Sequence, residues 1–492
     1  FITHPLTPHP SPLTTLASSL YITSQIPLMA SQQRHVQHLY LRAGFGESPA
    51  IVKQRSAKEI KQLVDDLFTE SKQYRNLTYL ENPAKGKEVS NLKVLLLILK
   101  SQEQMRELNN VWMGMLASTK AVLREKMTLF WHDHFATSTQ FAYLMQLQNN
   151  TLRKHALGRF DKLLHAIAKD PAMIIYLNNQ QNKKDAPNEN FAREVMELFT
   201  LGEGNKYTEA DIKEAARAFT GWTVNKKGEF EFVAKDHDDE SKTFLGRAGN
   251  FNGEDIINIL LEEKQTAKYV TTKIYKEFVN DNVNDAHVEA LSTIFFDSGY
   301  DISALMRNIF TADWFYADEN MGSLIASPVD LITRFRRLIK MEFKEEKGQF
   351  NTQKILGQVL FFPPNVAGWK GGRNWVDSST LMLRMQIPTR IIRGGGFNVR
   401  PKPEFEDAPE DEMTLKTSKK ADVRSDWSGV VNYFKDVPTD QLTESVIETF
   451  IQSSSDHIDR NIIAQYVDNS SDEKRILSTI GVVMSLPEFQ LI

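Results

Sequence analysis

Apolar residues recur at helical spacing along most of the chain. In residues 56–72 they stand at positions i, i+3, i+4 and i+7, which places Ile60, Leu63, Val64 and Leu67 on one face of a helix. The same spacing predicts further helices over 101–135, 160–169, 187–201, 208–220, 253–262, 265–279, 285–297, 301–311, 327–340 and 352–359. Thr208 followed by Asp211 resembles a capping box, with Asp in place of Glu or Gln. The pattern predicts a mainly α protein.

Strand signals are weak by comparison. The best lies in residues 227–233, where Phe230 and Phe232, together with residues 223–225, predict a small hairpin. Strands and helices do not alternate, which argues against a doubly wound parallel sheet. We therefore expect a large single domain of many helices, with one small β-hairpin and long loops.

Two segments interrupt the helical pattern. Residues 1–32 are rich in Pro, Ser and Thr and lack the basic region and the unbroken apolar region of a secretory signal, so we expect a disordered leader. The alternative is a poorly formed signal cut near Ala30. Residues 388–425 combine glycines, prolines and an acidic run, which predicts a flexible charged insertion. These boundaries leave a main helical domain over 33–387 and a C-terminal helical segment over 426–492 that packs on it.

Composition narrows the function classes. With 59 Lys and Arg against 63 Asp and Glu, the net charge is −4, which argues against nucleic acid as a partner. The absence of Cys removes disulfides, zinc–thiolate sites and thiol nucleophiles. No stretch reaches the ~18 apolar residues of a membrane span, since the most apolar run, Val94–Leu99, has the length of a core segment. The lack of a clear signal favours a soluble, cytoplasmic protein.

The first candidate site is the run from Phe130 to Phe135, in which Asp133 separates His132 from His134. Imidazole and carboxylate groups are common metal ligands. In a regular helix the two His would project about 200° apart, so a shared metal requires the helix to end near Trp131. The alternative is that His134 is a hydrogen-bonded core residue and His132 lies at the surface or caps the helix.

The second candidate is the helix predicted over 187–201. Asn190, Glu194 and Glu197 share one of its faces, and a pair of glutamates can hold a divalent cation or act as acid and base when buried. The alternative is an ordinary solvated face on which Arg193 is the counter-charge.

The third candidate is the acidic loop over 235–240. His237 and Asp238, flanked by Asp236 and Asp239, offer an imidazole and hard oxygen ligands. The alternative is a solvated acidic turn.

The fourth candidate is the Gly-rich segment over 361–375. Trp369 and Trp375 can stack on a planar group or a sugar face, with Asn365 and Arg373 as polar partners. The alternative is a tight surface turn whose Trp rings fill gaps between neighbouring helices.

Together these segments resemble the bacterial domain-of-unknown-function-1800 family from about Gln33 to the C-terminus. The resemblance is carried, in order, by residues 38–46, 127–135, 186–202, 215–222, 242–246, 363–369 and 485–489. Members of that family are often exported and often encoded beside an alkaline-phosphatase-like family, domain of unknown function 1501. The resemblance therefore implies a periplasmic or cell-envelope location and an alkaline-phosphatase-like partner.

These observations lead to one hypothesis of a metal-dependent enzyme, a hydrolase or an oxidoreductase. A divalent or transition metal ion would be held by His132, His134, His237 and Asp238. Catalysis would fall to Glu194, Glu197 and Arg193. Ligand binding would fall to Asn190, Asn365, Trp369, Arg373 and Trp375.

The alternative hypothesis is a non-catalytic binding or scaffold protein for a polysaccharide or for the exported alkaline-phosphatase-like partner. The enzyme requires the polar clusters to converge in one concavity. The binding protein allows them to scatter, with the Trp rings on an open surface. A third, structural hypothesis makes each cluster a helix cap or a buried hydrogen-bond network.

Overall fold

The structure is a computed structural model that describes residues 31–394, 396–398 and 420–492. The expected leader falls almost wholly on residues 1–30, outside the described part. Residues 31 and 32 already belong to a helix over 31–42.

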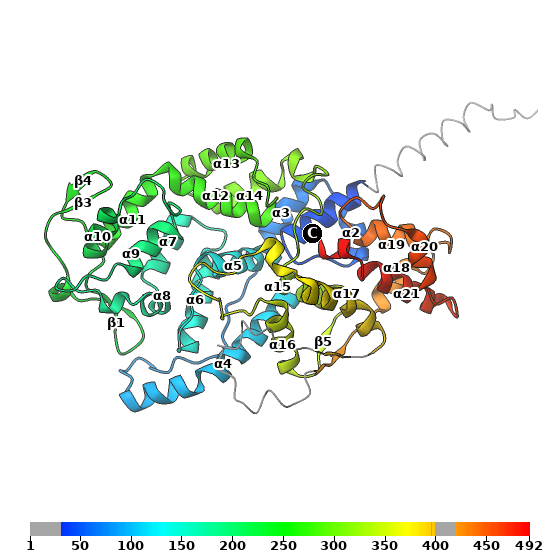
Figure 1. Cartoon of the computed structure of the whole chain (residues 1–492), viewed down its shortest axis with the longest axis horizontal. Coiled ribbons are helices and arrows are strands. Elements are labelled where there is room, and N and C mark those ends of the chain that lie inside the picture. The colour runs from blue at the N-terminus through cyan, green and yellow to red at the C-terminus, as the bar shows by residue number, and fades with distance from the viewer. Residues whose placement is uncertain (1–30, 395, 399–419) are drawn as a thin grey trace, which may run out of the picture.

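The molecule is elongated, with a β-containing end, a helical centre and a C-terminal helical end (Figure 1). The β-containing end is formed by α7 (Phe160–Ala168), α8 (Pro171–Tyr176), α9 (Asn190–Glu197), α10 (Glu209–Ala218), α11 (Gly253–Glu262), β1 (Trp222–Val224), β2 (Phe230–Phe232), β3 (Lys242–Phe244) and β4 (Arg247–Gly249). The centre is formed by the helix over 31–42, α3 (Ile60–Glu70), α4 (Asn91–Ser118), α5 (Val122–His134), α6 (Ala142–His155), α12 (Lys264–Phe278), α13 (Asp285–Asp297), α14 (Ile302–Phe310), α15 (Pro328–Leu338) and α16 (Glu346–Leu356). The C-terminal end is formed by α2 (Pro49–Arg55), α17 (Ser378–Ile392), α18 (Ser428–Phe434), α19 (Leu442–Phe450), α20 (Arg460–Gln465) and α21 (Asp472–Met484).

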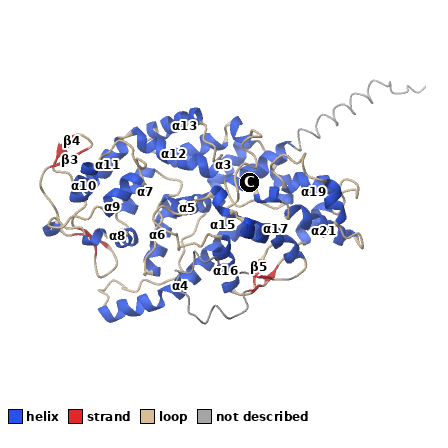
Figure 2. Cartoon of the chain, in the orientation of Figure 1, coloured by secondary structure: helices blue, strands red, loops and turns tan. Residues whose placement is uncertain are grey.

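The mainly helical fold class is confirmed, and the strands form only two-stranded sheets (Figure 2). The predicted hairpin is β1–β2, in which Trp222 lies opposite Phe232. A second hairpin, β3–β4, was not expected. Two long-range pairs also form, between β5 (Glu342–Phe343) and β8 (Val423–Arg424) and between β6 (Phe397–Asn398) and β7 (Lys420–Ala421).

Local sequence explains where several helices begin. The predicted capping box is present at α10. The Thr208 side chain accepts a hydrogen bond from the Asp211 backbone N–H, and the Asp211 carboxylate accepts one from the Thr208 backbone N–H. Asn252 and Asp255 form the same reciprocal pair at α11. These caps satisfy backbone donors that the first helical turn leaves free.

Both ends of the segment predicted as a flexible insertion over 388–425 belong to regular elements. Helix α17 continues through Pro388 to Ile392, and Val423 is buried in a strand paired with Phe343. Residues 395 and 399–419 lie outside the described part of the chain.

The apolar interior forms two large clusters. One surrounds Trp131 and Phe160 and reaches into the β-containing end. The other surrounds Trp112 and Phe335 and includes Phe450 and Phe489 from the C-terminal end. Residues 426–492 thus share a core with helices of the preceding segment.

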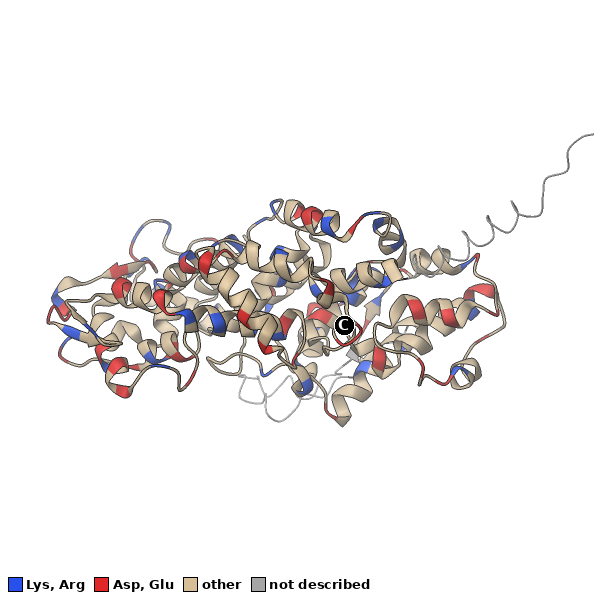
Figure 3. Cartoon of the chain, turned by 90° about the horizontal axis from the view of Figure 1, so that it is seen from above, with Lys and Arg blue, Asp and Glu red and all other residues tan. Residues whose placement is uncertain are grey.

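Basic and acidic residues are interspersed along the described part of the chain (Figure 3). Within the described residues we find no helix that combines the length and apolar character needed to cross a membrane.

A buried ion pair crosses the interface between α5 and α6. Arg153 Nε lies 2.6 Å from Glu125 Oε1, and the Trp112 indole N–H donates to Glu125 Oε2 at 2.9 Å. Both charged side chains are at most 1% exposed. Each charge has therefore exchanged its hydration for this network.

Replacing Glu125 with Gln leaves the Arg153 guanidinium buried without a counter-charge. We expect the free energy of unfolding, measured in urea by circular dichroism, to fall by about 3–5 kcal/mol. Glu444→Gln is the control, because Glu444 pairs with Arg460 at 2.7 Å but its side chain is 52% exposed. The control should lose less than about 1 kcal/mol. Equal losses in the two variants would contradict the prediction.

Candidate functional site

The two histidines of the first candidate lie on one unbroken helix. Helix α5 continues to His134 and does not end near Trp131, so the rings of His132 and His134 project in different directions. The condition for a shared metal ion, a helix end near Trp131, is therefore not met. His132 Nε2 accepts the Phe361 backbone N–H at 3.0 Å.

Both imidazoles are enclosed by aromatic rings. His132 lies between Trp112, Phe361 and Trp369, and burial, with a smaller effect of the Arg153 charge, lowers its pKa to about 3. Burial also lowers the pKa of His134 well below its ordinary value. Both rings are therefore neutral at physiological pH and act as packing and hydrogen-bonding groups.

The α9 candidate is a network of ion pairs around one arginine. Arg193 lies 2.8 Å from Glu209, 3.3 Å from Glu197 and 3.2 Å from Glu189. Asn190 Nδ2 donates to the Leu177 carbonyl at 3.1 Å.

Glu194 is half-buried on the same helix. Burial, and secondarily the Glu197 charge, raises its pKa. Arg193 is thus the counter-charge for the glutamates of α9, as in the alternative interpretation of this helix. The face that carries Asn190, Glu194 and Glu197 is only partly solvated.

The acidic loop is likewise held by structural contacts. Arg217 donates to Asp238 through Nε at 2.7 Å and Nη2 at 3.2 Å. His237 Nδ1 lies 2.9 Å from the Thr220 carbonyl. These bonds join the loop to the end of α10. Among the described residues, no group of three or more His, Asp or Glu side chains is arranged to hold a metal ion.

The Gly-rich segment over 361–375, which we call the Trp segment, contacts Asp133, the residue between His132 and His134. The Trp369 backbone N–H donates to Asp133 Oδ1 at 2.7 Å. Gly368, at φ +78°, allows this approach, because a Cβ there would lie 2.2 Å from Asp133 Oδ1.

The other members of the Trp segment differ in exposure. The side chains of Trp369 and Trp375 are 6% and 8% exposed and line a cavity, not an open surface. Asn365 accepts the Ala367 N–H within the loop, and Arg373 is exposed.

This cavity, which we call the central cleft, lies where α5, α12 and α15 meet the Trp segment. Its volume is about 70 Å³. Because ~10–15 Å³ of cavity volume holds one water molecule, the central cleft can hold several water molecules. Its polar and aromatic lining includes Asp133, Lys276, Glu277, Asp281, Ser327, Asp330, Gln358, Trp369 and Trp375.

A buried lysine organises one wall of the central cleft. Lys126 Nζ lies 2.8 Å from both carboxylate oxygens of Asp330 and 3.3 Å from Glu277 Oε1. Lys126 and Asp330 are buried, while the Glu277 side chain is 40% exposed.

Arg42, from the helix over 31–42, lies behind this wall. Its Nη2 donates to the Asn320 carbonyl at 2.8 Å. Burial lowers its pKa to about 9, against the attraction of Glu277, Asp281 and Asp330.

The Asp133 carboxyl, which lines the central cleft, forms no ion pair with a cation among the described residues. Burial raises its pKa to about 7, although the Trp369 N–H and the Lys273 charge act in the opposite direction. Although part of the Glu277 side chain is exposed, the residues packed around its carboxyl remove water from it and raise its pKa, against the Lys126 charge. Two carboxyls of one cavity are thus held closer to neutrality than in water.

Three segments that carried the family resemblance meet here. They contribute Arg42, Asp133 and Trp369, from residues 38–46, 127–135 and 363–369. The Glu277, Asp281 and Asp330 carboxylates and Lys126 were missed by sequence reasoning, because no local motif marks them.

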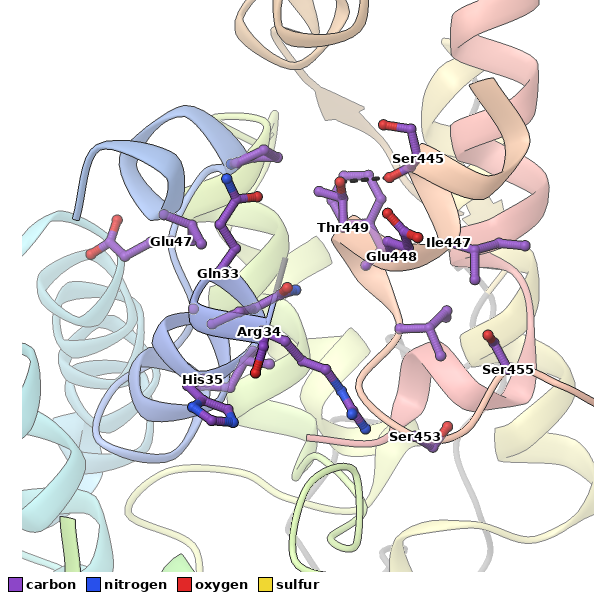
Figure 4. A pocket seen from close by; sticks show the side chains of 18 of the residues that line it. Gln33, Arg34, His35, Glu47, Ser445, Ile447, Glu448, Thr449, Ser453 and Ser455 are labelled. Atoms are coloured by element: carbon purple, nitrogen blue, oxygen red, sulfur yellow. Dashed lines mark hydrogen bonds between the residues drawn. The ribbon is translucent and has the colours of Figure 1, made fainter. Parts of the chain in front are cut away.

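A second and larger cavity, of about 740 Å³, separates the helix over 31–42 from α19. Figure 4 shows Gln33, Arg34 and His35 on one side and Ser445, Glu448 and Thr449 on the other. Arg34 is tied to Asp318 at 2.8 Å. The wall of this larger cavity includes Ser31, the first described residue, and we propose no chemistry for the cavity.

The fold and the central cleft define a mainly helical protein with a small acidic cavity at its centre. Residues 38–491 match the family described as "Protein of unknown function (DUF1800)", and the chain belongs to that family. The resemblance inferred from the motifs is thereby confirmed. No curated protein and no solved structure matches the chain.

The Asp133 carboxyl should make stability depend on pH. Because its pKa is raised in the folded state, it stabilises the fold fully below the unfolded pKa of ~3.9, and this contribution is lost as pH rises towards 7. We expect the difference in free energy of unfolding between wild type and Asp133→Asn to change over that pH window. It should fall by up to about 4 kcal/mol, to the disadvantage of wild type, as the pH rises.

Asn is the suitable replacement because it keeps an oxygen for the Trp369 N–H. Urea unfolding at several pH values measures the effect, and carbon NMR of the Asp carboxyls gives the pKa directly. A difference between the two proteins that does not change with pH would refute the raised pKa.

Proposed function

We propose that this chain is an enzyme that uses the central cleft for acid–base catalysis on a hydroxyl-bearing substrate, with Asp133 as the proton-carrying group. The observation that carries the proposal is the Asp133 carboxyl, which lines a solvent-reaching cavity and has a pKa raised to about 7. A general acid or base works best with a pKa near the working pH.

The contacts of Asp133 suit that role. The Trp369 N–H fixes one carboxylate oxygen, and the close approach of Gly368 leaves little freedom for the carboxyl to turn. Structural ion pairs usually lower a carboxyl pKa, whereas Asp133 has been buried without one. Proton exchange near neutral pH is therefore the chemistry this group supplies.

The remaining lining points to the substrate class. Glu277 and Asp281 accept hydrogen bonds from hydroxyl groups, and Trp369 and Trp375 provide apolar walls. The small volume admits one end of a ligand. A terminal sugar ring of a polysaccharide meets these requirements and is the substrate class we favour.

Asp133→Asn removes the transferable proton and keeps the shape. Against a panel of 4-nitrophenyl glycosides and esters, we expect wild type to turn over at least one substrate and the variant to lose ~10²–10⁴-fold in rate. Asp318→Asn, in the larger cavity, is the matched control and should keep the wild-type rate. Equal rates for Asp133→Asn and wild type would contradict the proposal.

Metal dependence remains a separate prediction. His132, His237 and Asp238 each contact a different partner, and His134 projects away from His132, which makes acid–base chemistry at Asp133 the better-supported proposal. Elemental mass spectrometry of untagged protein decides the matter. A stoichiometric metal ion that is lost in His132→Ala would favour the metal-dependent hydrolase or oxidoreductase.

The scaffold alternative is tested with the same preparations. Saturable binding of the exported alkaline-phosphatase-like partner, without turnover and unchanged in Asp133→Asn, would support a scaffold and refute catalysis in the central cleft.

A further inference from the structure

The first ten residues of α4 project from the body of the protein (Figure 1). Four leucines of this part are strongly exposed: Leu92 by 69%, Leu95 by 53%, Leu96 by 49% and Leu99 by 71%. Their spacing of i, i+3, i+4 and i+7 puts them on one side of the helix, which we call the leucine face. Val94, Leu97 and Ile98, on the opposite side, are less exposed. The apolar run is therefore not the core segment that its length predicts.

The leucine face is held away from the core by the rest of its helix. Met105, Leu108 and Trp112 of the same α4 are buried in the second apolar cluster, which fixes the helix direction. At the projecting end, the Ser90 side chain accepts from the Lys93 N–H, and the Val89 N–H donates to the Lys226 carbonyl at 3.0 Å. A continuous helix anchored at both ends cannot fold the leucines back.

Lysines gather around this end of the helix. Six exposed lysines outnumber four exposed glutamates in the flanking turn, helix α4 and the β1–β2 hairpin tip; they are Lys85, Lys87, Lys93, Lys100, Lys226 and Lys227, against Glu81, Glu88, Glu103 and Glu229. Two of these lysines are paired, Lys85 with Glu81 and Lys226 with Glu88. Helical geometry places Lys93 and Lys100 on the same flank of the leucine face. An apolar stripe bordered by cations is typical of helices that lie in the headgroup region of a membrane.

We propose that the leucine face docks on an anionic lipid surface, with α4 lying in the plane of the interface. The leucines insert between the lipid tails, and the lysines contact the headgroup phosphates. The apolar part, residues 92–99, is only ~12 Å long as a helix, which is far too short to span the ~30 Å hydrocarbon layer. Attachment is therefore peripheral.

A second copy of the chain is a less suitable partner for the leucine face than an anionic lipid surface. Stable dimers bury about 800 Å² per partner, whereas the projecting helix is only ~15 Å long over residues 91–100. Pairing two leucine faces would also bring the flanking lysines of both copies into one small contact. An anionic surface removes that repulsion.

Co-sedimentation with vesicles tests the docking. Wild type should bind vesicles containing phosphatidylglycerol, bind phosphatidylcholine vesicles at least tenfold more weakly, and lose binding as salt is raised. Leu95→Gln/Leu99→Gln should bind the anionic vesicles at least tenfold more weakly. Met382→Gln is the matched control, because Met382 is 61% exposed but lies on α17; it should bind as wild type does.

Other outcomes would overturn the proposal. They are a wild type that stays in solution with anionic vesicles, a double leucine variant that binds as wild type does, or a dimer in light scattering that the leucine variant abolishes. If the leucine variant unfolds, Lys93→Gln/Lys100→Gln tests the electrostatic part and should reduce binding severalfold. Asp133→Asn should bind vesicles as wild type does, because docking is independent of the central cleft.

Discussion

The buried ammonium of Lys126 joins three of the helices that build the centre of this protein. Lys126 belongs to α5, Asp330 to α15 and Glu277 to α12, and both carboxylates lie within 3.3 Å of its Nζ. A charge withdrawn from water is tolerated only with such partners, and removing one partner is strongly destabilising. The helices are therefore fixed relative to one another by electrostatics as well as by apolar packing.

This arrangement determines the character of the central cleft. Asp133 follows Lys126 by seven positions on α5, so the two side chains share one face of the helix. Lys126 is already engaged by Asp330 and Glu277, and the protein provides Asp133 with a backbone N–H but no adjacent cation. Burial therefore raises the pKa of Asp133, and the Lys273 charge opposes this rise only in part. Asp133 and the two carboxylates that contact Lys126 line the same cavity.

The other polar clusters serve the architecture of the β-containing end. Arg193 and Arg217 gather carboxylates from α9, α10 and the acidic loop. His237 fixes the loop to the end of α10 through the Thr220 carbonyl. These contacts agree with the third, structural hypothesis for those clusters, and they separate the β-containing end from the chemistry of the centre. The exposed leucines of α4 form a further, independent feature at the periphery.

The sequence by itself determined the elements that depend on neighbours along the chain. Helical spacing identified most helices, Thr208 and Asp211 identified a cap, and the aromatic residues around 222–232 identified a hairpin. Family membership followed from the ordered motifs. These features are local, because capping, turns and amphipathic faces are decided within a few residues.

Only the tertiary structure decided which charges meet and which apolar faces are covered. Glu277 and Asp330 lie more than 140 positions beyond Asp133, so no spacing rule connects them. The continuation of α5 through His134 separated two histidines that looked like a pair. The run at Val94–Leu99 reads as core in sequence but is largely exposed, because burial depends on what packs against a helix and not on its composition.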